Sequence, residues 1–133
     1  MLTKNDLGSI GSLPKPDTSP LVVALCAAWC DTCTEFRVAF DRIGRARPGM
    51  VFLWLDIEDD SELCGDIEIE NFPTLAIYRD GRLLHYGVSL PLEGTVSRLI
   101  DEIATRGDAG VAAPQAVLDL PTRLRQYARG AGA

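Results

Sequence analysis

The sequence predicts an α/β fold in which one mixed β-sheet is flanked by helices. Apolar runs of strand length alternate with amphipathic segments of helical period, and a tight-turn signal at Asp80-Gly81 separates the last two strand-like runs. The chain has 133 residues, of which 47% are hydrophobic and 24% charged. This size and composition suit one globular domain with its own core.

The first third of the chain predicts an irregular segment, a strand and a helix. Residues 1–20 are rich in glycine and proline, so at most a short helical turn is expected near Asp6 to Ile10. The run LVVALCA at 21–27 is short and contains β-branched valines, which predicts a buried strand. From Asp31 onward, apolar residues recur at helical spacing and predict an amphipathic helix that ends near residues 44–48.

The middle of the chain continues this alternation. The run MVFLWLDI at 50–57 predicts a second buried strand, and the acidic stretch at 59–69 predicts a short helix or turn. Strands are expected at 73–79 and 82–88, and an amphipathic helix of about 14 residues is expected after them. The first strands need crossover helices and the last two form a hairpin, so the sheet is expected to mix parallel and antiparallel pairs.

Residues 21–106 therefore predict a single domain, and residues 107–133 predict a linker with a C-terminal segment of helical pattern. The linker composition, GDAGVAAP, is typical of a flexible connection. Pro121 is expected to break or restart the final helix, because proline has no backbone N–H to donate.

The stretch LCAAWCDTCTEF at 25–36 holds three of the four cysteines. Two of them form a C-x-x-C where the predicted strand gives way to the predicted helix, so Cys30 is expected at a helix N-terminus. Unpaired N–H groups and the positive end of the helix dipole stabilise a thiolate there. Cys33 lies one turn further on, in reach of Cys30. This spacing predicts that Cys30 attacks a substrate disulfide and that Cys33 resolves the mixed disulfide.

The segment NFPTL at 71–75 opens the third strand. Proline does not fit the ladder of a central strand, so Pro73 is expected at the start of the strand. A cis Phe72–Pro73 bond there would be a specific feature of the fold, because cis is the minor isomer even before proline.

Taken together, AAWCDTC, DIE after the next strand and FPTLAIYRDG resemble the thioredoxin family, over roughly residues 21–106. The resemblance implies a thioredoxin-like fold and a thiol–disulfide oxidoreductase that reduces or exchanges protein disulfides. It implies an upstream thiol reductase as electron source and no cofactor beyond the redox-active pair Cys30–Cys33.

The resemblance also implies a substrate-binding surface. Pro73 would be cis and would pack beside the dithiol. The backbone of Phe72 and Thr74 would meet a substrate peptide, and Trp29 would lie beside the nucleophile.

The sequence departs from the family between the two cysteines. Thioredoxins typically have Gly-Pro there, whereas this chain has Asp31 and Thr32. An anionic neighbour disfavours the Cys30 thiolate and offsets part of the helix-end effect, so these two residues are expected to modulate the site.

A second departure concerns the proton of the resolving thiol. Ala24 stands where thioredoxins have a buried Asp that assists this proton transfer, and Trp54 stands where they have the paired Lys. Proton transfer at Cys33 is then expected to use Asp31, Glu58 or water.

Other interpretations of the cysteines are weaker. A zinc site would need Cys26 and Cys64 as further ligands, and Cys64 has no companion at ligand spacing. No metal is therefore expected. Cys26 is expected to be a small core residue, and Cys64 to be inert or, if its turn lies at the surface, open to oxidation. His85, the sole histidine, is expected to be an ordinary strand residue.

The net charge of −6 argues against a nucleic-acid partner. The arginines at 123, 125 and 129 are expected to form a solvated helix face. No apolar run is long enough to span a membrane, and the N-terminus lacks the apolar core of a signal peptide, so a cytoplasmic protein is expected. A monomer or weak dimer is the expected state. The alternative function is a protein-binding module whose dithiol is a redox sensor or vestigial.

Overall fold

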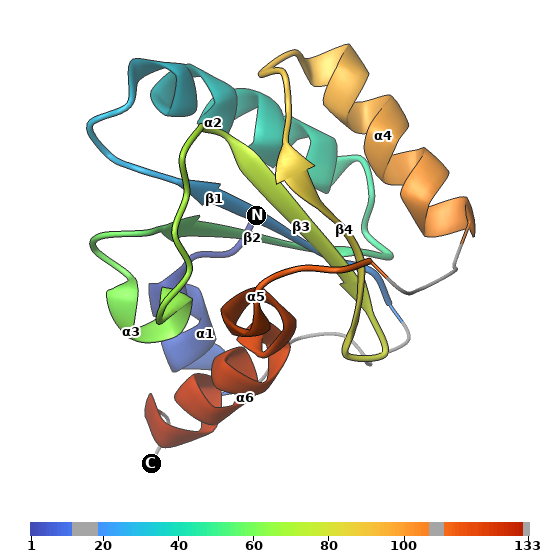
Figure 1. Ribbon diagram of the computed structural model, residues 1–133. Helices are drawn as coiled ribbons and strands as arrows, with labels where there is room; N and C mark the ends of the chain where they lie inside the picture. The colour runs from blue at the N-terminus through green and yellow to red at the C-terminus, as the bar shows by residue number, and fades with distance from the viewer. Residues whose placement is uncertain (12–18, 107–110, 132–133) are drawn as a thin grey trace.

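The computed structural model describes residues 1–11, 19–106 and 111–131, and these form one mixed sheet between two layers of helices (Figure 1). This confirms the predicted α/β class. The elements in chain order are α1 (Lys4–Ile10), β1 (Leu21–Cys26), α2 (Asp31–Arg45), β2 (Val51–Asp56), α3 (Ser61–Cys64), β3 (Thr74–Arg79), β4 (Arg82–Val88), α4 (Glu93–Arg106), α5 (Gln115–Leu118) and α6 (Leu120–Ala131).

The four strands lie in the order β2-β1-β3-β4. β1 pairs in parallel with β2, and the β1–β3 and β3–β4 pairs are antiparallel, as the crossover and hairpin arguments predict. The turn between β3 and β4 is made by Asp80 and Gly81, which both have positive φ, at 57° and 75°. Consecutive positive φ values match the twist of a two-residue hairpin, which explains the Asp-Gly pair at this position.

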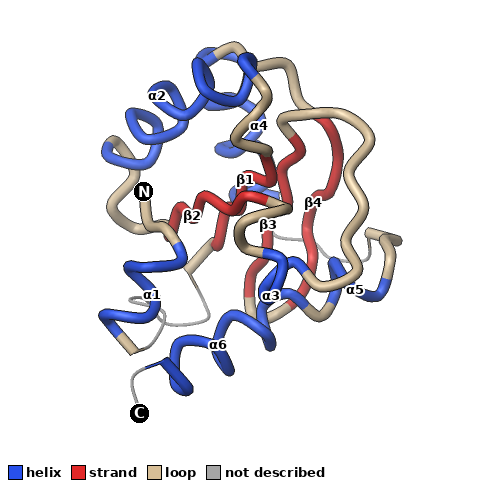
Figure 2. The backbone as a smooth tube through the Cα atoms, turned by 90° about the vertical axis from the view of Figure 1, so that its left-hand side faces the viewer, coloured by secondary structure: helices blue, strands red, loops and turns tan. Residues whose placement is uncertain are grey.

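Side chains of β1 alternate between two separate cores. Val22, Ala24 and Cys26 point toward α2 and α4, where they meet the apolar face of α2. The other set, beginning with Leu21 and Val23, points toward α1, α3 and the C-terminal helices. Figure 2 shows α2 and α4 on one side of the sheet and α1, α3, α5 and α6 on the other. Both faces of the sheet are therefore covered, which explains why β1 is an unbroken apolar run.

The N-terminal segment is more ordered than its glycine and proline content predicts. A capping box at Thr3 and Asp6 starts α1, which begins at Lys4 and not near Asp6. Leu2 forms a parallel bridge with Leu53 at the edge of β2, and its N–H donates to the Phe52 carbonyl oxygen at 2.7 Å. Residues 12–18 lie outside the described part of the chain.

The C-terminal segment packs on the sheet as two helices, interrupted as predicted around Pro121. Within it, Val117, Leu120, Leu124 and Ala128 are fully buried in the second core. The buried Tyr78 hydroxyl donates to the Val117 carbonyl oxygen at 2.7 Å, which ties α5 to β3. Residues 107–110 of the predicted linker lie outside the described part. Among the described helices, none is both long and apolar enough to cross a membrane.

The prediction of a solvated arginine face on α6 is wrong for Arg123. Its guanidinium donates to the carbonyl oxygens of Leu63 and Ala116, each at 2.6 Å, and of Cys64 at 3.2 Å. The last carbonyls of a short helix have no partner within that helix, and an arginine can satisfy several of them at once. Arg123 therefore fastens α6 to α3 and α5.

Candidate active site

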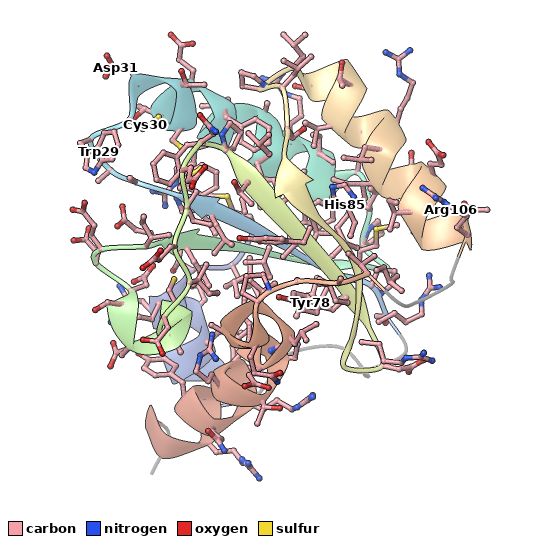
Figure 3. The ribbon with its side chains drawn as sticks, viewed as in Figure 1. Trp29, Cys30, Asp31, Tyr78, His85 and Arg106 are labelled. Carbon is pink, nitrogen blue, oxygen red and sulfur yellow. The ribbon has the colours of Figure 1, made fainter. Side chains whose placement is uncertain are left out.

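Cys30 lies at the N-cap of α2, immediately after the loop that leaves β1 (Figure 3). Its N–H donates to the Ala27 carbonyl oxygen at 3.1 Å, which makes a tight turn, and its own carbonyl accepts the Thr34 N–H at 3.1 Å. The side chain is half-buried, so its sulfur combines access to solvent with the unpaired N–H groups of the first helical turn. The structure thus places Cys30 at the helix N-terminus that the strand-to-helix transition predicts.

Cys33 lies one turn into α2 and is only 1% exposed. Burial raises the pKa of the Cys33 thiol, and hydrogen bonds from the Cys26 thiol and the Ala27 N–H partly oppose this rise. The neighbouring Cys30 raises the Cys33 pKa further. All four cysteines are free thiols. Two neighbouring thiols with different exposure are what a nucleophile and a resolving thiol require.

The loop before β3 forms the other wall of the site. The Phe72–Pro73 peptide bond is cis, as the resemblance implies. The indole of Trp29 packs edge-on against the Phe72 ring, with centroids 5.4 Å apart and planes at 85°. Thr74 is buried, and its hydroxyl donates to the Asn71 carbonyl oxygen at 2.8 Å. The structure therefore brings Trp29, on the dithiol loop, together with the proline loop.

Trp29 is held by a contact that the sequence did not predict. Its side chain is 64% exposed, and its indole N–H donates to a Glu58 carboxylate oxygen at 3.0 Å. Glu58, one of the three expected proton routes for Cys33, thus binds the indole instead of a thiol. Asp31 and Thr32 are exposed on the first turn of α2.

Asp56, at the end of β2, organises the adjacent loops. One carboxylate oxygen accepts the Ala28 N–H at 2.5 Å, and the other accepts the Glu58 N–H at 2.8 Å and the Asp59 N–H at 2.9 Å. It thereby links the loop before Cys30 to the loop after β2. Sequence reasoning quoted this residue only as part of DIE and gave it no role, although an Asp at a strand end that is followed by turn residues is a recognisable Asx-turn signal.

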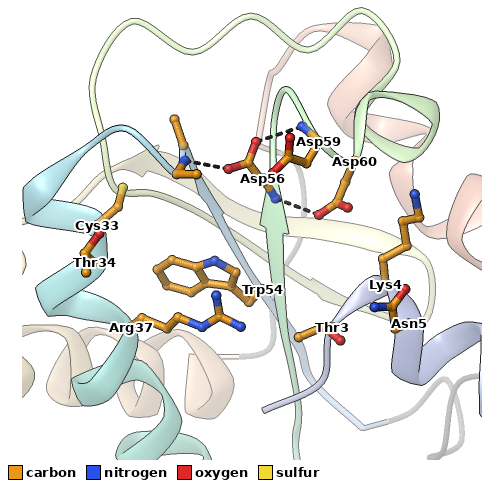
Figure 4. Close-up of a pocket in the computed structure, with 12 residues that line it drawn as sticks. Thr3, Lys4, Asn5, Cys33, Thr34, Arg37, Trp54, Asp56, Asp59 and Asp60 are labelled. Atoms are coloured by element: carbon orange, nitrogen blue, oxygen red, sulfur yellow. Dashed lines mark hydrogen bonds between the residues drawn. The ribbon is translucent and has the colours of Figure 1, made fainter.

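A pocket of about 470 Å³ lies behind the resolving thiol (Figure 4). Cys33 and Thr34 line it from α2, Asp56 from the end of β2, and Thr3 from the N-terminal segment. Trp54 is 8% exposed, and the Arg37 guanidinium lies 5.5 Å from its ring centroid. Cys33 therefore forms part of the wall of this pocket.

The family assignment follows from sequence comparison. The family model for thioredoxin matches residues 12–101, which include the dithiol, the proline loop and all four strands. The chain belongs to the thioredoxin family.

Individual thioredoxin relatives are distant. Thioredoxin-like protein CXXS1 of Oryza sativa subsp. japonica is 24% identical over 95 residues, which cover 71% of this chain and 69% of the relative. A thioredoxin of Mus musculus is 29% identical over 62 residues, or 47% of this chain and 59% of the relative. The chain spans 40%, 69% and 63% of the lengths of the first three curated relatives that it matches.

Solved thioredoxin structures share the fold. The oxidised thioredoxin of Plasmodium falciparum superposes with a TM-score of 0.57 at 22% identity, covering 75% of this chain and 91% of that one. The germline-specific thioredoxin Deadhead of Drosophila melanogaster has a TM-score of 0.59 at 21% identity, covering 75% and 93%. The thioredoxin-like fold expected from the motifs is therefore confirmed.

The remaining cysteine of this thioredoxin-family chain lies on the other side of the sheet. Cys26 and Cys33 belong to the core under α2, with Cys30 packed against it, whereas Cys64 is buried in the opposite core. Burial raises the pKa of Cys64 to about 12. The surface position considered for Cys64 is therefore wrong, and Cys64 cannot join the other three in a metal site. Within the described residues, no group of three or more potential ligands clusters around a point.

His85 lies on β4, away from the dithiol (Figure 3). Burial, and then the nearby positive charge of Arg106, lower the pKa of His85. Because His85 lies apart from Cys30, its half-buried imidazole takes no part in the site.

Proposed function

We propose that the protein is a thiol–disulfide oxidoreductase that reduces or exchanges protein disulfides through Cys30 and Cys33. The observation that carries this proposal is the half-buried Cys30 at the N-terminus of the 15-residue helix α2, with the buried Cys33 one turn away. The helix end favours a thiolate at the first position, and burial keeps the second thiol protonated until it is needed.

The reaction consists of two exchanges. The Cys30 thiolate attacks one sulfur of the substrate disulfide, so a Cys30–substrate bond forms, the substrate S–S bond breaks and one substrate thiolate leaves. Cys33, after losing its proton, attacks the Cys30 sulfur. The Cys30–Cys33 disulfide then forms and the second substrate thiolate leaves. Two electrons pass from the dithiol to the substrate, and an upstream thiol reductase restores the dithiol.

Substrate binding is assigned to the surface around the proline loop. Trp29, the residue before Cys30, packs on Phe72, and Phe72 and Cys30 both pack against the core under α2. Pro73 and Thr74 would offer backbone to an extended substrate segment. Asp31 and Thr32 would modulate the Cys30 thiolate from the first turn of the helix.

The enzyme is expected to need no cofactor beyond the Cys30–Cys33 pair, and its expected partners are protein disulfides and a thiol reductase. Nucleic acid is a poor partner for a chain with a net charge of −6. A cytoplasmic monomer or weak dimer, with a role in redox homeostasis and electron transport, fits a dithiol that must be kept reduced.

The test is a redox titration. The protein is equilibrated in graded thiol/disulfide buffers, free thiols are trapped by alkylation, and the modified cysteines are mapped by mass. We expect one two-electron transition between Cys30 and Cys33, near the value of about −270 mV that is typical of a reducing thioredoxin. Turnover of a protein disulfide should be lost in Cys30→Ser and kept in the matched control Cys64→Ser.

The titration also separates the alternative. If no Cys30–Cys33 disulfide forms at any potential, the oxidoreductase is ruled out. A protein-binding module with a redox-sensing or vestigial dithiol then takes its place, and its partner should remain bound after Cys30→Ser.

A further inference from the structure

A groove of about 450 Å³ lies beside the proline loop. Asn71 and Thr74, the residues on either side of Phe72 and Pro73, both line it. Its other walls include the end of β4, at residues 86–88, and the chain before α5. The groove is therefore continuous with the backbone to which substrate binding was assigned, and the two-step reaction leaves it without a role.

Hydrogen bonds hold the walls of the groove in place. The Ser89 N–H donates to the Pro73 carbonyl oxygen at 2.9 Å, which ties the chain after β4 to the proline loop. Thr74 lies opposite Val88 in the β3–β4 ladder, and its hydroxyl donates to the Asn71 carbonyl oxygen at 2.8 Å. Figure 1 shows the loop from α3 reaching the start of β3, beside the end of β4. A groove that is fixed in this way has little conformational entropy to lose when it binds a peptide.

The charged side chains that line the groove are all acidic. Asp66, Glu68 and Glu70 are exposed, and within the described residues none of the three has a hydrogen-bond or ion-pair partner. Residues 48–78 contain eight acidic residues and no Lys, Arg or His. Arg123 reaches the neighbouring α3, but its guanidinium binds three carbonyl oxygens and no carboxylate of the described chain. The groove therefore offers unpaired negative charge to a ligand.

The three carboxylates do not converge on one point. Ile67 is buried and Ile69 is half-buried, both against the core under α3, so the acidic residues that alternate with them lie on the outside. In the part of the chain that the structure describes, no group of three or more potential ligands is arranged to hold a metal ion. Several separate cations along a peptide therefore suit these carboxylates better than one metal ion does.

The neutral part of the lining suits the aliphatic stems of basic side chains. Val88 is 59% exposed and Tyr86 is half-buried, and both line the groove. Lysine and arginine pack their methylene groups on apolar surface while their charged ends reach polar groups. One side chain of this kind can therefore contact both the end of β4 and the carboxylates of the α3–β3 loop.

We propose that this groove binds a segment of the protein substrate that carries lysine or arginine within a few residues of its reactive cysteine. The inference rests on the proposed oxidoreductase function and names its substrate class, which is disulfides with basic flanking residues. The substrate sulfur meets Cys30 while the substrate backbone follows residues 72–74, and the continuing segment places its cations beside the three carboxylates. Opposite charges across an interface act mainly by raising the rate of association.

The test uses three synthetic peptides that share one intramolecular disulfide and differ only in flanking residues, which are all Lys, all Gln or all Glu. The reduced protein is mixed with each peptide, and the mass of acid-quenched samples gives the second-order rate of Cys30–Cys33 disulfide formation. At low salt we expect the Lys peptide to react about five- to tenfold faster than the Gln peptide, and the Glu peptide to react most slowly. These ratios should approach one at high salt, because exposed charge pairs are individually weak and are screened.

Charge reversal at one position assigns the preference to the groove. Glu70→Lys should lower the Lys/Gln rate ratio by about threefold or more. The matched control is Glu102→Lys, which changes the net charge equally at an exposed position on α4 and should keep the ratio. A second measurement, independent of turnover, is the Kd of peptides whose cysteines are replaced by serine. The Lys peptide should bind more tightly than the Gln peptide, and equal Kd values would contradict the proposal.

The contrary results separate this inference from the proposed function. Equal rates for the three peptides, or a Lys preference that Glu70→Lys leaves unchanged, would overturn the groove while the oxidoreductase stands. An equal loss of preference in Glu102→Lys would indicate net charge alone and would also overturn it. If millimolar Ca²⁺ abolishes the preference and NaCl of the same ionic strength does not, the groove is a metal site and the peptide assignment is wrong. If no peptide is reduced and no Cys30–Cys33 disulfide forms, the proposed function fails and the substrate class fails with it.

Discussion

At the scale of single residues, the first turn of α2 exerts two opposing influences on Cys30. The N-terminus of the helix favours an anion, whereas the exposed Asp31 carboxylate, one residue away, repels a second negative charge. Asp31→Asn should therefore speed the alkylation of Cys30 by iodoacetamide at neutral pH, by about two- to threefold for a surface charge pair. The gain should shrink in high salt, because exposed charges are screened.

Glu35 provides the control for this prediction. It is also exposed and lies one turn further along α2, so Glu35→Gln changes the net charge equally without removing the neighbour of Cys30. Equal acceleration in both variants, or an effect that salt does not reduce, would show that Asp31 has no specific influence.

Residue-level prediction from sequence succeeded where the signal was local. The C-x-x-C spacing and the strand-to-helix transition placed Cys30 and Cys33 correctly relative to α2. The bond from Trp29 to Glu58 and that from Ala28 to Asp56 join residues 29 and 28 positions apart. No periodicity or short motif encodes such a pairing, so these loop contacts appear only when the strands are side by side.

At the scale of elements, an arginine after α2 couples this helix to α4. Arg47 donates to both carboxylate oxygens of Asp101, at 2.8 and 2.7 Å, and also to the Ser97 hydroxyl and the Ile43 carbonyl. The hydrogen bonds from Arg47 lower the pKa of Asp101. Both helices cover the face of the sheet that carries the dithiol, so this link holds the layer together.

The link between these helices should be sensitive to acid. A carboxyl whose pKa is lower in the folded state stabilises the protein above its unfolded pKa of about 3.9, and this contribution is lost as pH falls through the folded value. Asp101→Asn should lower the free energy of unfolding by about 0.5–1 kcal/mol at pH 7, since the pair is partly exposed. Urea unfolding at pH 7 and below pH 3 measures this. Glu102→Gln, on the neighbouring exposed residue, should have little effect, and a loss in Asp101→Asn that persists below pH 3 would contradict the role of charge.

Elements with strong periodicity were predicted and elements that depend on distant partners were not. The strands, the hairpin and α2 follow from their own residues. The length of α1 and the docking of α6 do not, because Arg123 reaches its carbonyl partners 59 and 60 residues away. From the sequence pattern alone, an arginine on an amphipathic helix is predicted to be solvated. The helix C-terminus that it caps is known only from the folded structure.

At the scale of the whole molecule, the sheet separates two cores that must form together. The C-terminal helices supply four fully buried residues to the core that does not contain the dithiol. Without them, one face of β1 and β3 would be exposed to water. The tail should therefore belong to the folding unit of the domain, although its sequence indicates a separable segment after a flexible linker.

This argument predicts that a cavity in the tail weakens the core on the opposite face. Leu124 is fully buried on α6, and Leu124→Ala should lower the free energy of unfolding by about 2–5 kcal/mol. Trp54 lies in the core on the dithiol side of the sheet, and a Trp29→Phe background makes it the sole tryptophan. In Leu124→Ala, Trp54 fluorescence and far-UV circular dichroism should show the same drop in the urea midpoint of unfolding. Leu118→Ala, on a tail residue that is 36% exposed, should shift the midpoint far less. A tail that unfolds independently would instead lose helix signal first and leave the Trp54 midpoint unchanged, because the two faces would then share no cooperative transition.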